Sequence, residues 1–256
     1  MNWKTFFALL SRDAHVARRN MLPLLLQTMI QPLLFTFIFG RVLTTSGMMP
    51  AQYKAVLLPG IIAICMVLSG IQAVAMPLIA EFQFTREIED RLLAPIETSW
   101  LAVEKIVAGM IQALAAGLVV IPAAWLLMGS GVKISFERPL EFAAMCLLVA
   151  LLSSAGGLAL GCSVGQTQIG LMFSLILAPM MMFGCAYYPW SALTPFPVLK
   201  YAVLVNPLVY ASEGLRAALA PQVPHIRLPI VLAALTLLDL LLLTLGLAKF
   251  RKKAVS

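Results

Sequence analysis

The sequence predicts an all-α, polytopic membrane protein with six transmembrane helices, and three observations support this. Hydrophobic residues make up 61% of the 256 residues and charged residues only 11%, and the mean hydropathy is +0.96. Apolar runs close to the length that crosses a bilayer recur along the whole chain. A water-soluble domain of this size has too little interior to bury six helices that are apolar all round.

The apolar runs set the expected spans. They lie near residues 22–40, 57–80, 101–128, 140–162, 168–188 and 229–248. Residues 189–228 are also fairly apolar, but prolines would break a full span there. We therefore expect an extracytoplasmic segment of re-entrant helices before the last span. No repeat or linker divides the chain, so residues 1–256 are predicted to form one transmembrane domain.

The two ends of the chain indicate its orientation. Within residues 1–21, apolar side chains recur on one helical face and basic ones flank it, which is typical of an amphipathic helix on a membrane surface. This segment lacks the features of a cleavable signal, so we expect it to be retained. Eleven of the 18 Lys and Arg residues fall on the side of the two termini. The positive-inside rule therefore places both termini in the cytoplasm and the chain in the cytoplasmic (inner) membrane.

The net charge of +7 does not indicate a nucleic-acid partner, because the basic residues lie between apolar runs and at the two ends, as membrane anchors do. The four cysteines fall in or beside predicted spans without metal-ligand spacing. The two histidines, His15 and His225, are expected on opposite sides of the membrane. We predict no metal site and no catalytic residues.

One short polar stretch interrupts the apolar pattern. Residues 81–100 hold five acidic side chains and two arginines. Phe84, Ile88 and Leu92 recur at four-residue spacing, with ion pairs at i,i+4 on the opposite flank, which predicts an amphipathic cytoplasmic helix over 81–97. Pro95 ends it. A solvated loop helix that only joins two spans would show the same pattern.

The chain resembles type-2 ABC transporter permeases, the family that includes drug-resistance and lipo-oligosaccharide exporters. Two segments carry the resemblance. The first has the form F-x-x-x-R-E-x-E-x-x-L-L-A-P, here Phe82, Arg86, Glu87, Glu89, Leu92, Leu93, Ala94 and Pro95. The second has the form N-P-x-x-Y-x-x-E-G-x-R, here Asn206, Pro207, Tyr210, Glu213, Gly214 and Arg216. With the six spans and the amino-terminal helix, the resemblance covers nearly the whole chain.

The resemblance implies that two permease chains form a homodimer in the bilayer and that each docks an ABC ATPase subunit. The chain has no G-x-x-x-x-G-K-[ST] motif, so it is predicted not to be an enzyme and to bind no cofactor, while ATP and magnesium act in the partner. The polar stretch would then be a coupling helix. Its expected ATPase-docking residues are Phe82, Phe84, Arg86, Glu87, Ile88, Glu89, Asp90, Arg91 and Leu92.

Other residues of the spans are candidates for the substrate path or for helix packing. Amides and flexible thioethers suit a varied amphipathic substrate, although both also occur as packing groups. The substrate-path candidates are Gln27, Gln31, Met180 and Met181. The helix-packing candidates are Ser153, Gly157, Gly161 and Gly165, which form a face of small residues, and Asp239, a mid-span acid that is also a functional candidate. Glu213 and Arg216 are expected to pair near the outer surface, as an outer gate.

The predicted function is the transmembrane permease subunit of an ATP-driven exporter that moves an amphipathic, drug-like or lipid-linked substrate out of the cytoplasm. Two alternatives remain open. One is a secondary transporter driven by an ion gradient, which would require Asp239. The other is a non-transporting assembly subunit with the same architecture. The sequence does not identify the substrate or decide between a homodimer and a heterodimer.

Overall fold

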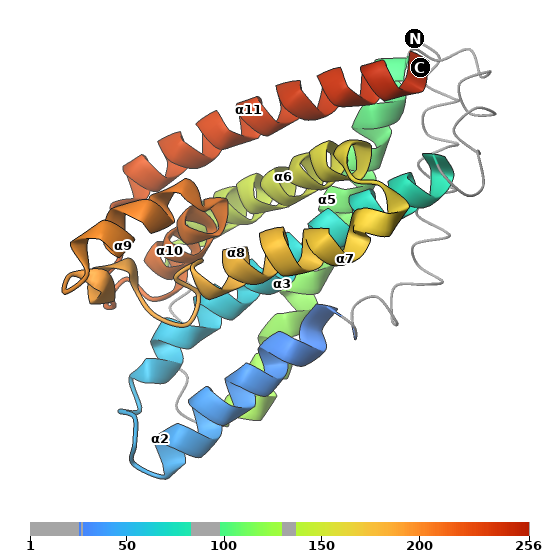
Figure 1. Cartoon of the computed structure of the whole chain (residues 1–256). Coiled ribbons are helices and arrows are strands. Elements are labelled where there is room, and N and C mark those ends of the chain that lie inside the picture. The colour runs from blue at the N-terminus through green and yellow to red at the C-terminus, as the bar shows by residue number, and fades with distance from the viewer. Residues whose placement is uncertain (1–25, 27, 83–97, 130–136, 256) are drawn as a thin grey trace.

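The computed structural model describes residues 26, 28–82, 98–129 and 137–255, which form a bundle of helices (Figure 1). No strand occurs in these residues, and five of their helices are long and apolar enough to cross a membrane. These are Thr28–Thr45, which ends in η1 (Ile38–Val42) and α2 (Leu43–Thr45), α3 (Tyr53–Ala80), α5 (Thr98–Met128), α6 (Pro139–Ser163) and α11 (Leu228–Val255). The predicted all-α, polytopic class is therefore confirmed.

The fifth predicted span is shorter than expected. Residues 169–182 form one apolar rod made of α7 (Ile169–Leu171), the π-helix η4 (Met172–Leu177) and α8 (Ala178–Met182), and we call this rod the short span. It follows α6 through η3 (Gln166–Gln168). Fourteen residues reach about 21 Å, against about 30 Å of bilayer hydrocarbon. The prediction of a span over 168–188 was too long because residues 183–188 are turns and bends, although they are apolar.

Helix α3 is the core of the bundle. It packs against α5, α6 and α10, and most of its residues from Leu57 to Ile79 are buried. Helix α11 lies along α6, as Figure 1 shows, and buries a stripe that includes Val231, Leu235 and Phe250. A helix that is apolar all round is stable in this central position because it has neighbours on every side.

The proline-rich segment 189–228 is divided into short helices: η5 (Trp190–Leu193), α9 (Pro197–Ala202), η6 (Val203–Val205) and α10 (Pro207–Leu219). Pro197 and Pro207 each occupy a first helical position, where the missing N–H costs nothing. The Asn206 side chain caps α10 by accepting a hydrogen bond of 3.0 Å from Leu208 N. Helix α10 packs against α3, α6 and α11, so this segment folds back onto one end of the bundle.

The bundle has two distinct ends (Figure 1). The carboxyl-terminal ends of α3 and α11 meet at one end, where Phe82 contacts Phe250. The start of α3 and the end of α5 meet at the other, where Lys54 Nζ donates to Met128 O at 2.8 Å. The predicted interfacial helix over 1–21 lies outside the described residues, as does the predicted coupling helix except for Glu81 and Phe82.

Candidate functional site

The first candidate site is the end of the bundle from which the polar segment 83–97 leaves. We call the residues that join the helices here the helix-end cluster: Glu81, Phe82, Ser99, Lys105, Phe250, Arg251 and Lys253. Glu81 at the end of α3 pairs with Lys105 of α5, with Oε1 and Nζ 2.7 Å apart, and both side chains are largely buried. The pair therefore ties together the two helices that flank the segment.

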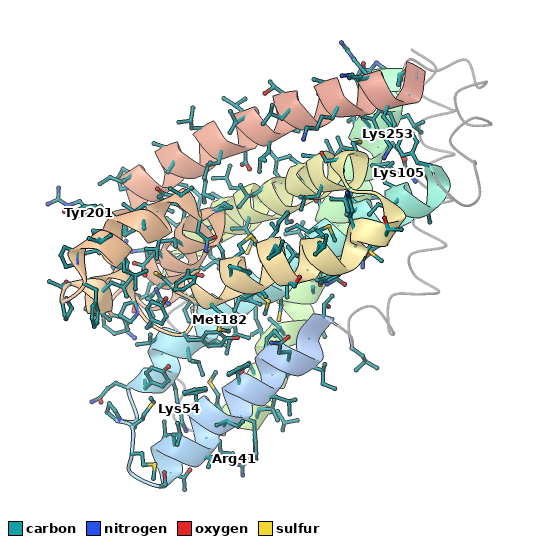
Figure 2. The ribbon with its side chains drawn as sticks, viewed as in Figure 1. Arg41, Lys54, Lys105, Met182, Tyr201 and Lys253 are labelled. Carbon is teal, nitrogen blue, oxygen red and sulfur yellow. The ribbon has the colours of Figure 1, made fainter. Side chains whose placement is uncertain are left out.

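Helix α11 supplies the rest of the cluster. The Phe82 and Phe250 rings meet edge to face with their centroids 5.9 Å apart, and Lys253 Nζ lies 4.7 Å from the Phe82 ring centroid. Arg251 donates from Nη2 to Ser99 Oγ at 2.6 Å. Figure 2 shows Lys105 and Lys253 together at this end, away from Arg41 and Lys54. The last turns of α11 therefore contact both the end of α3 and the start of α5.

Of the predicted docking residues, the structure describes Phe82, which packs into the helix-end cluster. The other eight, Phe84 to Leu92, lie outside the described residues. The sequence analysis missed Lys105, Phe250 and Lys253 as parts of this site. The charge of Lys105 inside an apolar span was a signal that could have found it, because such a charge needs a partner. No local sequence pattern indicated that Phe250 is part of this site.

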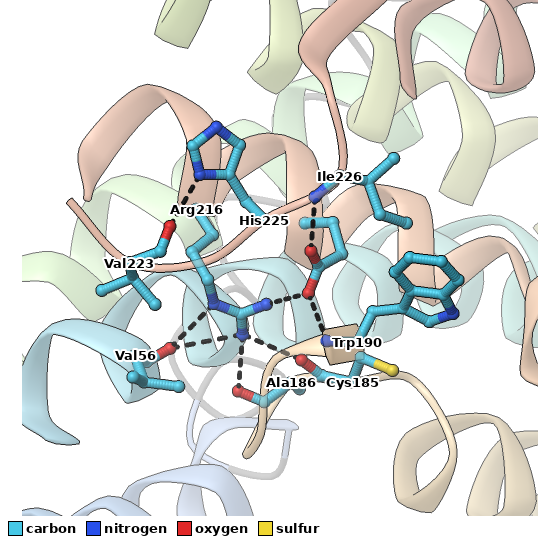
Figure 3. Close-up of polar contacts among 9 residues, drawn as sticks. Val56, Cys185, Ala186, Trp190, Arg216, Val223, His225 and Ile226 are labelled. Carbon is cyan, nitrogen blue, oxygen red and sulfur yellow. Dashed lines mark hydrogen bonds and ion pairs between the residues drawn. The ribbon is translucent and has the colours of Figure 1, made fainter. Parts of the chain in front are cut away.

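The second candidate site is the Glu213–Arg216 network, shown in Figure 3. Glu213 and Arg216 form an ion pair on one face of α10, and both side chains are 0% exposed. Arg216 Nη2 donates to Cys185 O at 2.8 Å and to Val56 O at 3.3 Å. Glu213 accepts from the backbone N–H groups of Trp190 and Ile226, each at 2.9 Å. The network therefore joins α10 to α3, to the turn after the short span, and to the start of η5.

The charges of this network are compensated within the protein. Burial lowers the pKa of Arg216, and the carboxylate of Glu213 raises it. Because both side chains are fully buried and each is the ionic partner of the other, removing either one would leave an uncompensated buried charge. The predicted pairing of Glu213 with Arg216 is present, but the pair is enclosed rather than placed on an open surface. Its role as an outer gate stays a prediction.

The predicted face of small residues lies between α6 and α3. A Cβ at Gly157 would approach Ile71 O to 2.8 Å, and one at Gly161 would approach Ala75 Cα to 3.0 Å. Ser153 lies against Gly70. These positions let two helix backbones approach closely. Gly165 does not extend the face as predicted, because α6 ends at Ser163 and Gly165 lies in the following turn, where its N–H donates to Gln168 Oε1.

The substrate-path candidates are not gathered at one place. Gln31 is exposed on the first span, and Gln27 lies outside the described residues. Met180 lines a large apolar groove beside the short span. Met181 is buried in the main core, so its side chain cannot meet a substrate without a rearrangement of that core. Among these four candidates, the structure shows accessible side chains for Gln31 and Met180.

Asp239 lies in the middle of α11 with only 2% of its surface exposed. Neither carboxylate oxygen has a hydrogen-bond partner among the described residues. Leu235 and Leu242, one turn away on either side, belong to the apolar core. The position is closed within the bundle, and no cluster of His, Cys, Asp or Glu that could hold a metal occurs in the described part of the chain.

Comparisons with known proteins agree with this architecture. Residues 4–220 match the family described as "ABC-2 type transporter". The chain is 25% identical over 217 residues to the "Inner membrane transport permease YadH" of Escherichia coli strain K12, an alignment that covers 84% of this chain and 82% of that protein. The protein of the same name from Shigella flexneri gives the same values. Since the match spans most of its length, the chain belongs to the ABC-2 type transporter family.

Proposed function

We propose that this permease subunit of an ABC transporter exports an amphipathic, drug-like or lipid-linked substrate from the cytoplasm. It acts as a homodimer, and each copy docks an ATPase subunit that hydrolyses ATP with magnesium. Family membership supports the permease role and the association with an ABC ATPase. The direction of transport, the substrate class and the homodimer belong to the proposal.

The observation that carries the coupling mechanism is the position of the described residues that flank segment 83–97. Phe82 precedes the segment and belongs to the helix-end cluster, and Thr98 follows the segment and adjoins Ser99 of the same cluster. Glu81 and Lys105 bind the two flanking helices to each other. Because α3 is the most buried span, a push on this segment would move the centre of the bundle rather than a peripheral helix.

The substrate class is inferred from the accessible surfaces of the spans. The first span exposes apolar side chains such as Leu26, Ile30 and Leu34 together with the Gln31 amide. A surface of this kind suits a molecule with a large apolar part and a few hydrogen-bonding groups. By analogy with the relatives, which are named inner membrane permeases, we place the chain in the inner membrane. The distribution of Lys and Arg residues supports cytoplasmic termini.

Co-purification with the ATPase tests the docking step. Phe84→Asp and Ile88→Asp each place a carboxylate on the predicted apolar face of the coupling helix, so we expect loss of the ATPase with normal membrane insertion. Val198→Asp is the matched control, since Val198 is 83% exposed in α9, near the other end of the bundle. Retention of the ATPase by both docking variants would reject this docking site.

Transport itself is tested in proteoliposomes. The permease with its ATPase should move a fluorescent amphipathic probe when ATP and magnesium are supplied on the cytoplasmic face, and the docking variants should not. Movement driven by an ion gradient without the ATPase would favour the secondary transporter. Probe-independent hydrolysis with no movement of any substrate would favour the assembly subunit.

A further inference from the structure

A large apolar groove lies beside the short span, outside the two sites described above. Its volume is about 910 Å³. Helix α6, the short span and α11 form its walls. Representative lining residues, two from each of these elements, are Gly156, Ala159, Leu175, Ile176, Leu242 and Leu245.

The two ends of the groove differ in chemistry. Val203 and Pro207 of the re-entrant segment line one end, and both are apolar. Lys249 and Ser163 line the other end, with Lys249 Nζ donating to Ser163 Oγ at 2.6 Å. Arg251, two residues after Lys249, belongs to the helix-end cluster. The groove therefore runs from the re-entrant segment to Lys249, close to the helix-end cluster.

Most polar groups in the groove are already bonded within the protein. Ser153 Oγ donates to Ala150 O at 2.9 Å, and Asn206 Nδ2 donates to Met180 O at 2.8 Å. The ammonium group of Lys249 has three donors, of which Ser163 takes one, and none of the ion pairs among the described residues involves it. A ligand would thus meet apolar walls and one free positive charge.

The length of the groove also restricts the ligand. Its α6 wall runs from Leu152 to Ser163, which is about 17 Å at the rise of an α-helix. One leaflet of the hydrocarbon core is about 15 Å thick, half of the full core. A single acyl chain that starts at the level of Lys249 would therefore be long enough to follow the α6 wall of the groove.

The packing of the short span shows what such a ligand would do. Elements η4 and α8 contact each other, and α8 contacts α10, whereas any contact of η4 or α8 with α11 in the described chain is weaker. Leu175 and Ile176 remain exposed beside the groove. The groove therefore lies between the short span and α11.

We propose that this groove binds one phospholipid of the bilayer with an anionic headgroup. Its phosphate pairs with Lys249, and one acyl chain lies between the short span and α11. A basic residue between membrane helices is a known form of headgroup site. This lipid is a resident ligand that supports the short span and is separate from the transported substrate.

The lipid retained by the purified chain tests the proposal. After a detergent wash that removes bulk lipid, extracted phospholipids are quantified by mass spectrometry for each headgroup class. Wild type should retain a single anionic phospholipid per chain. Lys249→Gln should retain about fivefold less of it, from the loss of one basic contact. Gly156→Leu fills the groove, because a Cβ there lies at an ordinary 3.8 Å from Leu242 Cδ1, and should lose the lipid whatever its headgroup.

Matched variants separate the site from general lipid contacts. Lys252→Gln removes a neighbouring exposed charge that does not line the groove, and Gly170→Leu adds the same side chain where no described atom lies within 4 Å. Both should retain lipid like wild type. Equal retention by Lys249→Gln and Lys252→Gln, or full retention by Gly156→Leu, would overturn the proposal.

A second measurement does not depend on how the glycine variant folds. Wild type in nanodiscs that contain phosphatidylglycerol should unfold at a higher temperature than in nanodiscs of phosphatidylcholine alone. This difference should disappear for Lys249→Gln and persist for Lys252→Gln. The same unfolding temperature in both lipids for wild type would reject a resident anionic phospholipid.

Discussion

Different kinds of contact hold the helices together at the two ends of the bundle. At the Glu213–Arg216 network, charged groups are fully buried and bond to backbone carbonyl and N–H groups. Tyr53 adds a further bond of this type to Tyr187 O at 2.6 Å. At the helix-end cluster, most contacts join side chains to side chains. The Glu81–Lys105 pair is largely buried, but the contacts of Arg251 with Ser99 are exposed, and the one bond to a backbone group, from Lys253 to Gly161 O, is long at 3.4 Å.

This difference indicates which end can move. A side chain bonded to several backbone groups fixes the chain segments that carry them, and breaking such a buried network is costly. An exposed contact between two side chains contributes little and can reform with another partner. We infer that the exposed contacts between Arg251 and Ser99 rearrange when the segment 83–97 is pushed, while the Glu213–Arg216 network serves as the fixed point. The four predictions below test this comparison.

Arg216→Met should have the largest effect. It leaves the Glu213 carboxylate buried without its cation and removes the bonds to Val56 and Cys185. We expect a loss of about 3–5 kcal/mol in unfolding free energy, measured in detergent as reduced thermal stability. Arg227→Met makes the same change at an exposed arginine and should stay near wild type. Equal stabilities for the two variants would show that the network is not a fixed point.

Gly157→Ala should have the next largest effect, because it separates the helices that connect the two ends. The new methyl group would lie 2.8 Å from Ile71 O, so α6 must move away from α3. The expected cost is about 1–3 kcal/mol. Gly156→Ala is the adjacent control, where the methyl group has room and should raise helix stability slightly. An unchanged unfolding free energy for Gly157→Ala would show that α6 and α3 can move apart at little cost.

Asp239→Leu should stabilise the chain, because it removes a buried carboxyl group that has no hydrogen-bond partner in the described part of the chain. We expect a gain of about 1 kcal/mol in unfolding free energy and unchanged ATP-driven transport. Thermal unfolding and the proteoliposome assay measure the two effects. Asp239→Asn keeps the shape of the side chain and serves as the comparison. Loss of transport in both variants, with normal folding, would support the alternative driven by an ion gradient.

Arg251→Met should have the smallest effect on stability, below about 1 kcal/mol, since the contacts with Ser99 are exposed. Its effect should appear instead in coupling, as a weaker stimulation of the partner's ATP hydrolysis by substrate. Lys252→Met is the matched control, because Lys252 is also exposed and is not part of the cluster. A large loss of stability would show that this end is as rigid as the other.

Part of the candidate site could be predicted from local sequence. The pairing of Glu213 with Arg216 followed from three-residue spacing on one helix, and the close approach of Gly157 followed from the repeat of small residues. The contacts of Lys105 with Glu81 and of Phe82 with Phe250 could not be predicted in this way. These partners lie on different helices, and their register depends on how the helices pack.

The sequence by itself determined that this protein is helical and spans a membrane, because backbone groups in a bilayer must bond within their own segment and long apolar runs leave no other solution. It also carried the family resemblance. The tertiary structure alone decided that the short span ends at Met182, that Met181 is buried while Met180 faces a groove, and that Glu213 and Arg216 are enclosed. Hydropathy measures transfer from water to an apolar medium, and it does not distinguish lipid from the side of a neighbouring helix.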